Sequence, residues 1–197
     1  LLFIGQFKSP RCFGRLTPNE LNIDYHANKK GWMNTSIFNA WLTQFNDDMR
    51  KNDRQALLLV DNASPHRVSE ELSNVRVEYL PPNTTSHLQP LDGGIIASLK
   101  KHIRRLQNND LAKKVEILRQ RHKALGNAPS RKDISDLFLV DVLVAIRWAQ
   151  AAWENVSSST IQNCWKHTLL VGEQAAEMAT ELESHCPDAP TIQFLSV

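Results

Sequence analysis

Short apolar runs and one longer periodic pattern alternate along the first half of the chain. Residues 57–60 are four consecutive apolar side chains, too few for a typical helix, and they predict a fully buried strand. Residues 75–80 predict the next strand, after a short helical turn at 69–73. Upstream, 34–50 carries apolar residues at helical spacing, which predicts an amphipathic helix capped by one of its first polar residues. Further strands are expected at 3–4 and 22–27.

The second half of the chain has the period of helices. One helix is predicted to start at Asp92 and to run to Leu106, and a second to span residues 111–124. The Gly-Asn-Ala-Pro sequence at 126–129 ends the second helix. Residues 133–153 predict a third helix that is apolar nearly all round, and a fourth is expected to begin at the capping residues 157–160.

The alternation of strands and helices predicts one α/β domain. A chain of 197 residues is long enough for a single domain with a sizeable core. We expect residues 1–125 to form the core, 126–172 a helical C-terminal extension of the same domain, and 173–197 an acidic, loosely held tail.

Two aspartates stand at the ends of predicted elements. Asp61 directly follows the strand at 57–60, and Asp92 comes after the next strand and a turn-rich loop opened by two prolines. A carboxylate at the C-terminal end of a buried strand lies at the sheet edge where open α/β folds place their chemistry. Two such acids suit a two-metal phosphodiester site, because Mg²⁺ binds one or two carboxylates together with water and substrate phosphates. The structural alternative is that each aspartate is a turn residue or a helix cap.

Composition is that of an ordinary globular protein. Apolar residues make up 42% of the chain and charged residues 22%. No apolar run approaches the length of a membrane span and the first residues lack the layout of a signal peptide, so no membrane partner is expected. The three cysteines are widely spaced, which indicates reduced thiols in an intracellular protein. Cys164 and His167 lack the second pair that a structural zinc requires.

Charge is unevenly distributed, although the net charge is only +2. Residues 98–125 contain nine lysines and arginines against two acids, whereas 133–188 contains nine acids against two basic residues. A basic block directly after the candidate metal site favours a polyanionic substrate. The alternative for each basic residue is a solvated helix face. Contacts with the phosphates of such a partner are predicted for Lys100, Lys101, Arg104, Arg105, Lys113 and Lys114.

The sequence around the two aspartates resembles a known family. DNASPH at 61–66 and YLPPNTTSHLQPLDGGIIASLK at 79–100 are similar to the catalytic core of the pogo/Tigger/jerky-type transposases, a branch of the mariner superfamily that has centromere protein B among its relatives. KSPRCF at 8–13, YHANKKGWM at 25–33 and the segment at 145–167 also resemble the family. The resemblance therefore covers nearly the whole chain.

The resemblance implies a ribonuclease H-like mixed sheet with flanking helices, a helical C-terminal extension and a DDD or DDE metal site. Asp61 opens the DN-x-x-x-H motif and Asp92 ends the LPPNTTSxLQPLD motif, so both are implied to be catalytic metal ligands. Asn62 and His66 match the first motif and are implied to support the site, which His87 also flanks. The implied cofactors are two Mg²⁺ or Mn²⁺ ions per complete site.

The first acid of the family lies upstream of the KSPRCF segment, on the first strand of the core. Glu20 and Asp24 come after that segment, so neither matches, and the first metal ligand is missing from this chain. Because the chain also starts in an apolar run, we expect it to be a piece of a longer protein that is inactive or nearly so by itself. Gly93 stands where the family usually has glutamine, which predicts a less rigid backbone around Asp92.

The function implied is that of a DNA transposase-type endonuclease and strand-transfer core that works in the nucleus. DNA is the expected partner, a homodimer or a higher transposase assembly is compatible with this function, and no small-molecule substrate is expected. The alternative belongs to a different class, a domesticated and catalytically silent domain that binds DNA or chromatin. A nuclease acting on RNA would fit the metal site but not the family motifs.

Overall fold

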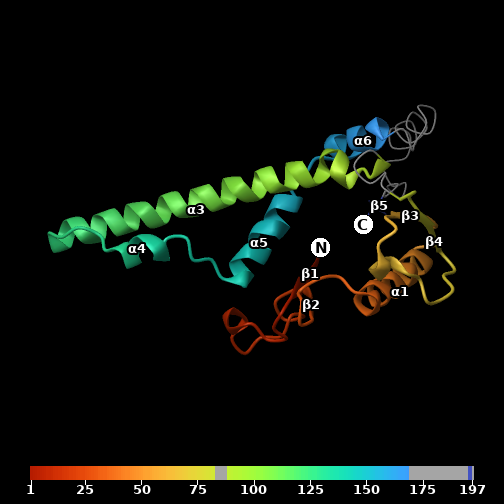
Figure 1. Cartoon of the computed structure of the whole chain (residues 1–197), viewed down its shortest axis with the longest axis horizontal. Coiled ribbons are helices and arrows are strands. Elements are labelled where there is room, and N and C mark those ends of the chain that lie inside the picture. The colour runs from red at the N-terminus through yellow and green to blue at the C-terminus, as the bar shows by residue number, and fades with distance from the viewer. Residues whose placement is uncertain (83–87, 169–194, 197) are drawn as a thin grey trace. The chain divides into compact units, whose positions relative to one another are not determined.

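Helices and two small parallel sheets make up the computed structural model, which describes residues 1–82, 88–168 and 195–196 (Figure 1). The chain divides into two units, each with its own sheet and its own apolar core. The first unit comprises residues 1–29 and 97–156, and the second comprises 30–96 and 157–197. The predicted α/β class is confirmed at this level.

The second unit is built on a three-stranded parallel sheet. β3 (Ala56–Val60) lies in the middle, between β4 (Val75–Tyr79) and β5 (Leu195–Ser196). The register aligns Ala56 with Val75 and Val60 with Tyr79, so β3 and β4 end together. The two strands predicted at 57–60 and 75–80 are confirmed.

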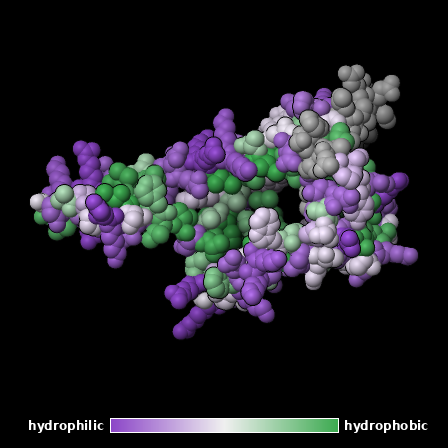
Figure 2. Space-filling model, in the orientation of Figure 1, coloured by the Kyte–Doolittle hydropathy of each residue, from purple (hydrophilic) through white to green (hydrophobic). Residues whose placement is uncertain are grey.

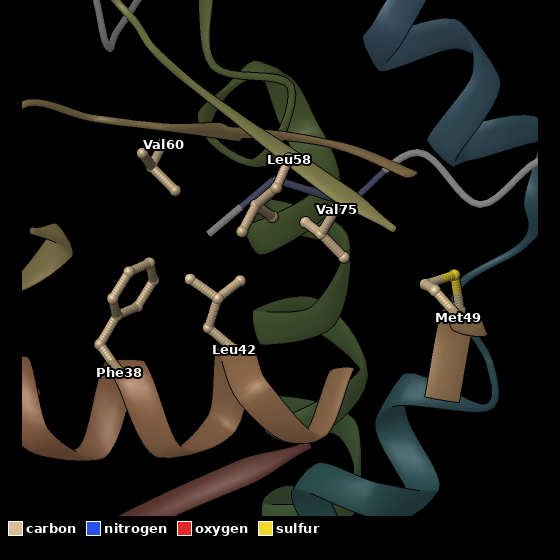
Figure 3. Close-up of a cluster of buried hydrophobic side chains, with 6 residues drawn as sticks. All are labelled: Phe38, Leu42, Met49, Leu58, Val60 and Val75. Carbon is tan, nitrogen blue, oxygen red and sulfur yellow. The ribbon is translucent and has the colours of Figure 1, made fainter. Parts of the chain in front are cut away.

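The helix α1 (Thr35–Lys51) packs on this sheet. It begins after Asn34, whose side-chain oxygen accepts the backbone N–H of Ile37 at 2.9 Å, so the predicted helix and its polar cap are confirmed. The prediction of a fully buried strand is wrong for Leu57, which is 50% exposed, because it points away from the face that α1 covers. Six buried side chains from α1, β3 and β4 form the core (Figure 3): Phe38, Leu42, Met49, Leu58, Val60 and Val75.

The connection between β3 and β4 contains one turn of 3₁₀ helix, η2 (Ser64–His66). The short helical turn predicted at 69–73 is absent, and this prediction is wrong. Asn39 of α1 explains the difference, because its Oδ1 accepts both the N–H of Ser69 at 2.9 Å and the hydroxyl of Ser69 at 3.0 Å. A side chain of α1 thus satisfies the backbone that a helical turn would have satisfied locally.

A single helix replaces the two that were predicted between residues 92 and 124. The chain forms a π-type turn, η3 (Leu91–Ile95), and then α3 (Ile96–Leu125), a helix of 30 residues. No glycine or proline lies between 107 and 110, so the backbone continues as a helix at little cost. Lys114 also pairs with Asp110 at 2.9 Å, one helical turn earlier, which supports the continuous helix.

The first unit contains β1 (Leu2–Gly5) and β2 (Asp24–Ala27), which pair in parallel as the predicted strands, and a 3₁₀ turn, η1 (Arg11–Phe13). Its core is formed by Phe13, Leu21, Ile23 and Ile146. The last of these residues belongs to α5 (Val142–Trp153), which is also tied to the β2 region by a polar contact. The Arg147 guanidinium donates to the carbonyl of Leu21 at 2.7 Å.

The helix predicted at 133–153 is interrupted, so this prediction is wrong. The structure has the short α4 (Arg131–Asp136), a connection, and then α5. Asp141 causes the interruption, because its carboxylate accepts the N–H of Val144 at 2.9 Å and caps α5. In the connection Phe138 and Leu139 are 66% and 68% exposed.

The last described helix, α6 (Ser158–His167), belongs to the second unit and is capped by Ser157, as predicted. The predicted boundaries at 125 and 172 stay predictions. The loop that follows Pro82, which includes His87, and the tail at 173–197 apart from β5 lie outside the described residues. Among the helices that the structure does describe, none combines the length and the apolar character needed to span a membrane.

Candidate metal and nucleic-acid site

Asp61 lies at the C-terminal edge of the β3–β4 pair. It directly follows Val60, the last residue of β3. Past the end of β4, the N–H of Leu80 donates to the carbonyl of Val60 at 2.8 Å. Because parallel strands end at the same edge, the segment that continues toward Asp92 leaves the sheet beside Asp61.

Only one of the two carboxylate oxygens of Asp61, Oδ1, has partners among the described residues. Its Oδ1 accepts the N–H of Ala63 at 3.2 Å, a local turn contact, and lies 2.6 Å from Nδ1 of His66. Its Oδ2 has no hydrogen-bond partner among the residues that the structure describes, and 32% of the side chain is exposed. Asp61 is therefore a turn residue, as the structural alternative predicts, and the turn leaves its Oδ2 available for a ligand.

His66 is held in place from three directions. Its ring packs against Phe38 with the centroids 4.9 Å apart, and the residue is buried. The hydroxyl of Tyr79, the last residue of β4, donates to the carbonyl of His66 at 2.8 Å. With Nδ1 directed at Asp61, this fixed imidazole orients the carboxylate. Asn62 is exposed and makes no hydrogen bond with any described residue.

Asp92 is exposed on η3, between the buried Pro90 and the buried Ile95. Its carboxylate forms neither a helix cap nor an ion pair with any residue in the described part of the chain. Gly94 has φ 147° and ψ −19°, outside the helical region, so the regular helix starts only at Ile96. The helix-cap alternative for Asp92 is therefore wrong.

The described residues supply part of a possible metal-binding site. The free oxygen of Asp61 and the exposed carboxylate of Asp92 are hard donors of the kind that Mg²⁺ and Mn²⁺ bind, so these residues fit such an ion. Within residues 1–82, 88–168 and 195–196, however, no three His, Cys, Asp or Glu side chains are grouped to hold a metal. Water, substrate phosphate and a further acid would have to complete the coordination. Cys164 and His167 likewise form no metal-binding group with other described residues.

The predicted DNA contacts lie on α3, in the first unit, and hydrophilic side chains project from this helix in Figure 2. Lys114 differs from the other five, because it is only 34% exposed, pairs with Asp110 and donates to the carbonyl of Leu139 at 3.1 Å. These contacts give Lys114 a structural role. The exposed members of the set are Lys100, Lys101, Arg104, Arg105 and Lys113.

Sequence reasoning missed two groups of supporting residues. The pattern at 75–80 predicts only a strand position for Tyr79, although a tyrosine at a strand end often directs its hydroxyl toward a polar partner. Cys164 and Thr168 lie against the turn that carries Asp92, and no local sequence pattern predicts this contact. Both contacts join elements that are distant in the chain.

The chain belongs to the DDE superfamily endonucleases, because the sequence model of this family matches residues 1–165. This confirms the resemblance found in its motifs. No solved structure matches the chain.

Several curated proteins are similar to this chain. It is 25% identical to mouse Tigger transposable element-derived protein 4 over 161 residues, which cover 82% of this chain and 28% of that protein. It is 29% identical to CENP-B homolog protein 2 of Schizosaccharomyces pombe over 185 residues, covering 88% and 33%. It is 27% identical to human major centromere autoantigen B over 165 residues, covering 83% and 24%. The chain thus spans only about a quarter to a third of these relatives.

Proposed function

We propose that this chain is the core of a transposase-type DNA endonuclease with a ribonuclease H-like fold, acting in the nucleus. The observation that carries the proposal is the placement of Asp61 and Asp92 on the two segments that leave one edge of the sheet, each with a carboxylate oxygen unused by described residues. Family membership supports it. Assembly as a homodimer or a larger complex belongs to the same proposal.

Each residue at this edge has a distinct task in the proposal. Asp61 presents its free Oδ2 to a metal, while His66 and the turn amide of Ala63 fix its Oδ1. Asp92 supplies a second carboxylate from η3. Bound Mg²⁺ or Mn²⁺ would activate water or a 3′-hydroxyl and stabilise the departing oxygen of a phosphodiester. An acid upstream of this chain would complete the ligand set.

The exposed cations of α3 would bind the DNA backbone. Lysine and arginine contacts with phosphates position a protein on DNA without reading its sequence. Two pairs of these cations are spaced one helical turn apart, Lys100 with Arg104 and Lys101 with Arg105. The two members of each pair therefore lie on the same side of the helix. Such rows can follow successive phosphates. Lys113 extends the exposed positive charge further along α3.

The metal proposal is tested by Mn²⁺ titration calorimetry on a form extended upstream through the first strand of the core. Asp92→Asn and Asp61→Asn are expected to weaken Mn²⁺ binding at least tenfold, because each removes a charged ligand. Asp136→Asn is the matched control, since Asp136 is an exposed acid on α4, in the other unit. Mn²⁺ binding that is equal in all four proteins would refute the assignment of Asp61 and Asp92.

The DNA proposal is tested by the salt dependence of binding to a DNA duplex. Each lost phosphate contact reduces the slope of log K against log salt by about 0.9. The double variant Arg104→Gln, Arg105→Gln should therefore bind more weakly and with a shallower slope. Arg131→Gln, Lys132→Gln is the control, because it removes the same charge from exposed residues of α4. Equal slopes in the two double variants would show that α3 is not the DNA-binding surface.

The second candidate is a domesticated domain that binds DNA without cleaving it. The similarity to proteins named as a centromere autoantigen and as CENP-B homologs favours this alternative. It predicts salt-dependent DNA binding through α3 together with weak Mn²⁺ binding that Asp92→Asn leaves unchanged. The two titrations above therefore separate the candidates.

A further inference from the structure

The turn that carries Asp92 is irregular, and its geometry is not set by the helix that follows. The carbonyl of Gln89 accepts the N–H groups of both Asp92 and Gly93 at 3.0 Å. The N–H of Ile96 donates to the carbonyl of Leu91, one residue further back than in an α-helix. The direction of Asp92 therefore depends on what packs against this turn.

Helix α6 packs against this turn within the same unit (Figure 1). A Cβ atom added to Gly94 would lie 3.0 Å from Sγ of Cys164, which is tighter than ordinary packing allows. One added to Gly93 would meet the carbonyl oxygen of Cys164 and Cγ2 of Thr168 at 3.8 Å, an ordinary contact. Cys164 and Thr168 are 7% and 3% exposed. Gly94 is thus the point of closest approach between the turn and α6.

The thiol of Cys164 lies against the backbone of this turn. Burial raises the pKa of the Cys164 thiol, and the backbone N–H of Ile95 acts in the opposite direction, as a donor beside a sulfur atom does. Ile95 is itself only 3% exposed. The sulfur therefore packs beside both Gly94 and Ile95.

We propose that α6 is the positioning element of Asp92, acting through Cys164, which packs on Gly94, and through Thr168, which packs on Gly93. This inference rests on the proposed function of Asp92 as a metal ligand and adds the residues that fix its direction. Cys164 touches no reacting group, so it is a positioning residue. Its effect on a metal would pass through the backbone of residues 93–95.

The first test measures the turn itself by amide hydrogen exchange. Cys164→Ala removes the sulfur that packs on the turn, so the turn should open more readily and exchange at the amide of Ile95 should accelerate several-fold. Cys164→Ser keeps a side-chain atom at this position and should return the rate most of the way. The amide of Leu58, in the core strand β3, should exchange as in the unchanged protein in both variants. Unchanged exchange at Ile95 in Cys164→Ala would overturn the proposal.

The second test measures Mn²⁺ affinity in the upstream-extended form and uses the two glycines as a matched pair. Gly94→Ala forces a side chain into a positive-φ position against Sγ and should weaken Mn²⁺ binding about tenfold, whereas Gly93→Ala has room and should not. Cys164→Ala should weaken binding and Cys164→Ser should restore it. Equal affinities of the two glycine variants, in a protein whose Mn²⁺ binding requires Asp92, would overturn the positioning role.

The two tests keep this proposal separate from the function on which it rests. If Mn²⁺ binding does not depend on Asp92, the metal proposal fails, and the exchange rate of Ile95 alone decides whether α6 fixes the turn. If Gly94→Ala does not fold, Cys164→Ala and Cys164→Ser still give the comparison, because neither adds volume to the contact.

Discussion

Leu57 and Leu58 are neighbours on β3 with opposite surroundings. Leu58 belongs to the core that α1 covers (Figure 3) and is 0% exposed. Leu57 is 50% exposed. We predict that Leu58→Ala lowers the free energy of unfolding far more than Leu57→Ala does. The pair is matched, because both substitutions remove the same atoms from adjacent positions of one strand.

The magnitudes follow from burial. Leucine to alanine removes three carbon atoms, and at about 0.8 kcal/mol per buried carbon Leu58 loses about 2.4 kcal/mol of transfer free energy. The cavity left among Phe38, Leu42 and Val75 raises the expected cost to about 3 to 4 kcal/mol. Leu57 should cost about 1 kcal/mol, since half of its surface is already in water. A domain of this size is stable by about 5 to 15 kcal/mol, so only the first change is severe.

Urea unfolding followed by tryptophan fluorescence measures both values. Trp41 is a suitable reporter, because its ring lies 6.2 Å from that of Phe38 in the same core. The slope of the free energy against urea should be the same in the two variants, so that the midpoints report stability. Equal losses from Leu57→Ala and Leu58→Ala would mean that α1 does not cover this face of β3. The described position of Asp61, which depends on that packing, would then be wrong as well.

Three further predictions concern single side chains. Tyr79→Phe removes the hydroxyl that donates to the carbonyl of His66 and should cost about 1 kcal/mol in urea unfolding, and a neutral result would contradict the bond. Burial raises the pKa of Cys164, so iodoacetamide followed by peptide mapping should label the partly exposed Cys12 before Cys164. Hydrogen bonds from Ser130, the N-cap residue of α4, lower the pKa of Asp133 below its ordinary value of 3.8. The stabilisation that the ionised Asp133 gives the folded protein is therefore complete above pH 3.8, and it is lost as the pH falls through the lowered pKa. Thermal unfolding of Asp133→Asn should therefore differ from that of the unchanged protein at pH 7 and converge with it in acid.

Helices that begin at a cap before a periodic pattern could be predicted, whereas boundaries inside one long pattern could not. The polar residue before α1 and the serine before α6 both cap as expected. The apolar pattern at 133–153 predicts that Asp141 is one position of a long helix, yet an aspartate directly before an apolar run is also typical of a helix start. At 107–110 the reverse error occurred, because asparagine and aspartate lower helix propensity only slightly and a long helix absorbs the cost.

The candidate site was predictable only as far as its linear motifs and strand ends. The position of Asp61 after β3 follows from the length of one apolar run. The contacts that orient the site do not, because they join Tyr79 to His66 and α6 to Gly94 across folded space. Neither contact has a periodic or compositional signature. The sequence therefore identified the two carboxylates and missed the residues that hold them.

Asp61 and Asp92 differ in how far folding alone can explain them. In the described part of the chain Asp92 neither caps nor pairs, so Asp92→Asn should leave the stability nearly unchanged. Asp61 contributes to a turn and faces His66, and asparagine keeps the oxygen that accepts from Ala63 while removing the charge. Asp61→Asn should therefore lose a little stability, and Asp92→Asn none. Lost metal binding at unchanged stability would identify Asp92 as a ligand, because no contact with a described residue accounts for its charge.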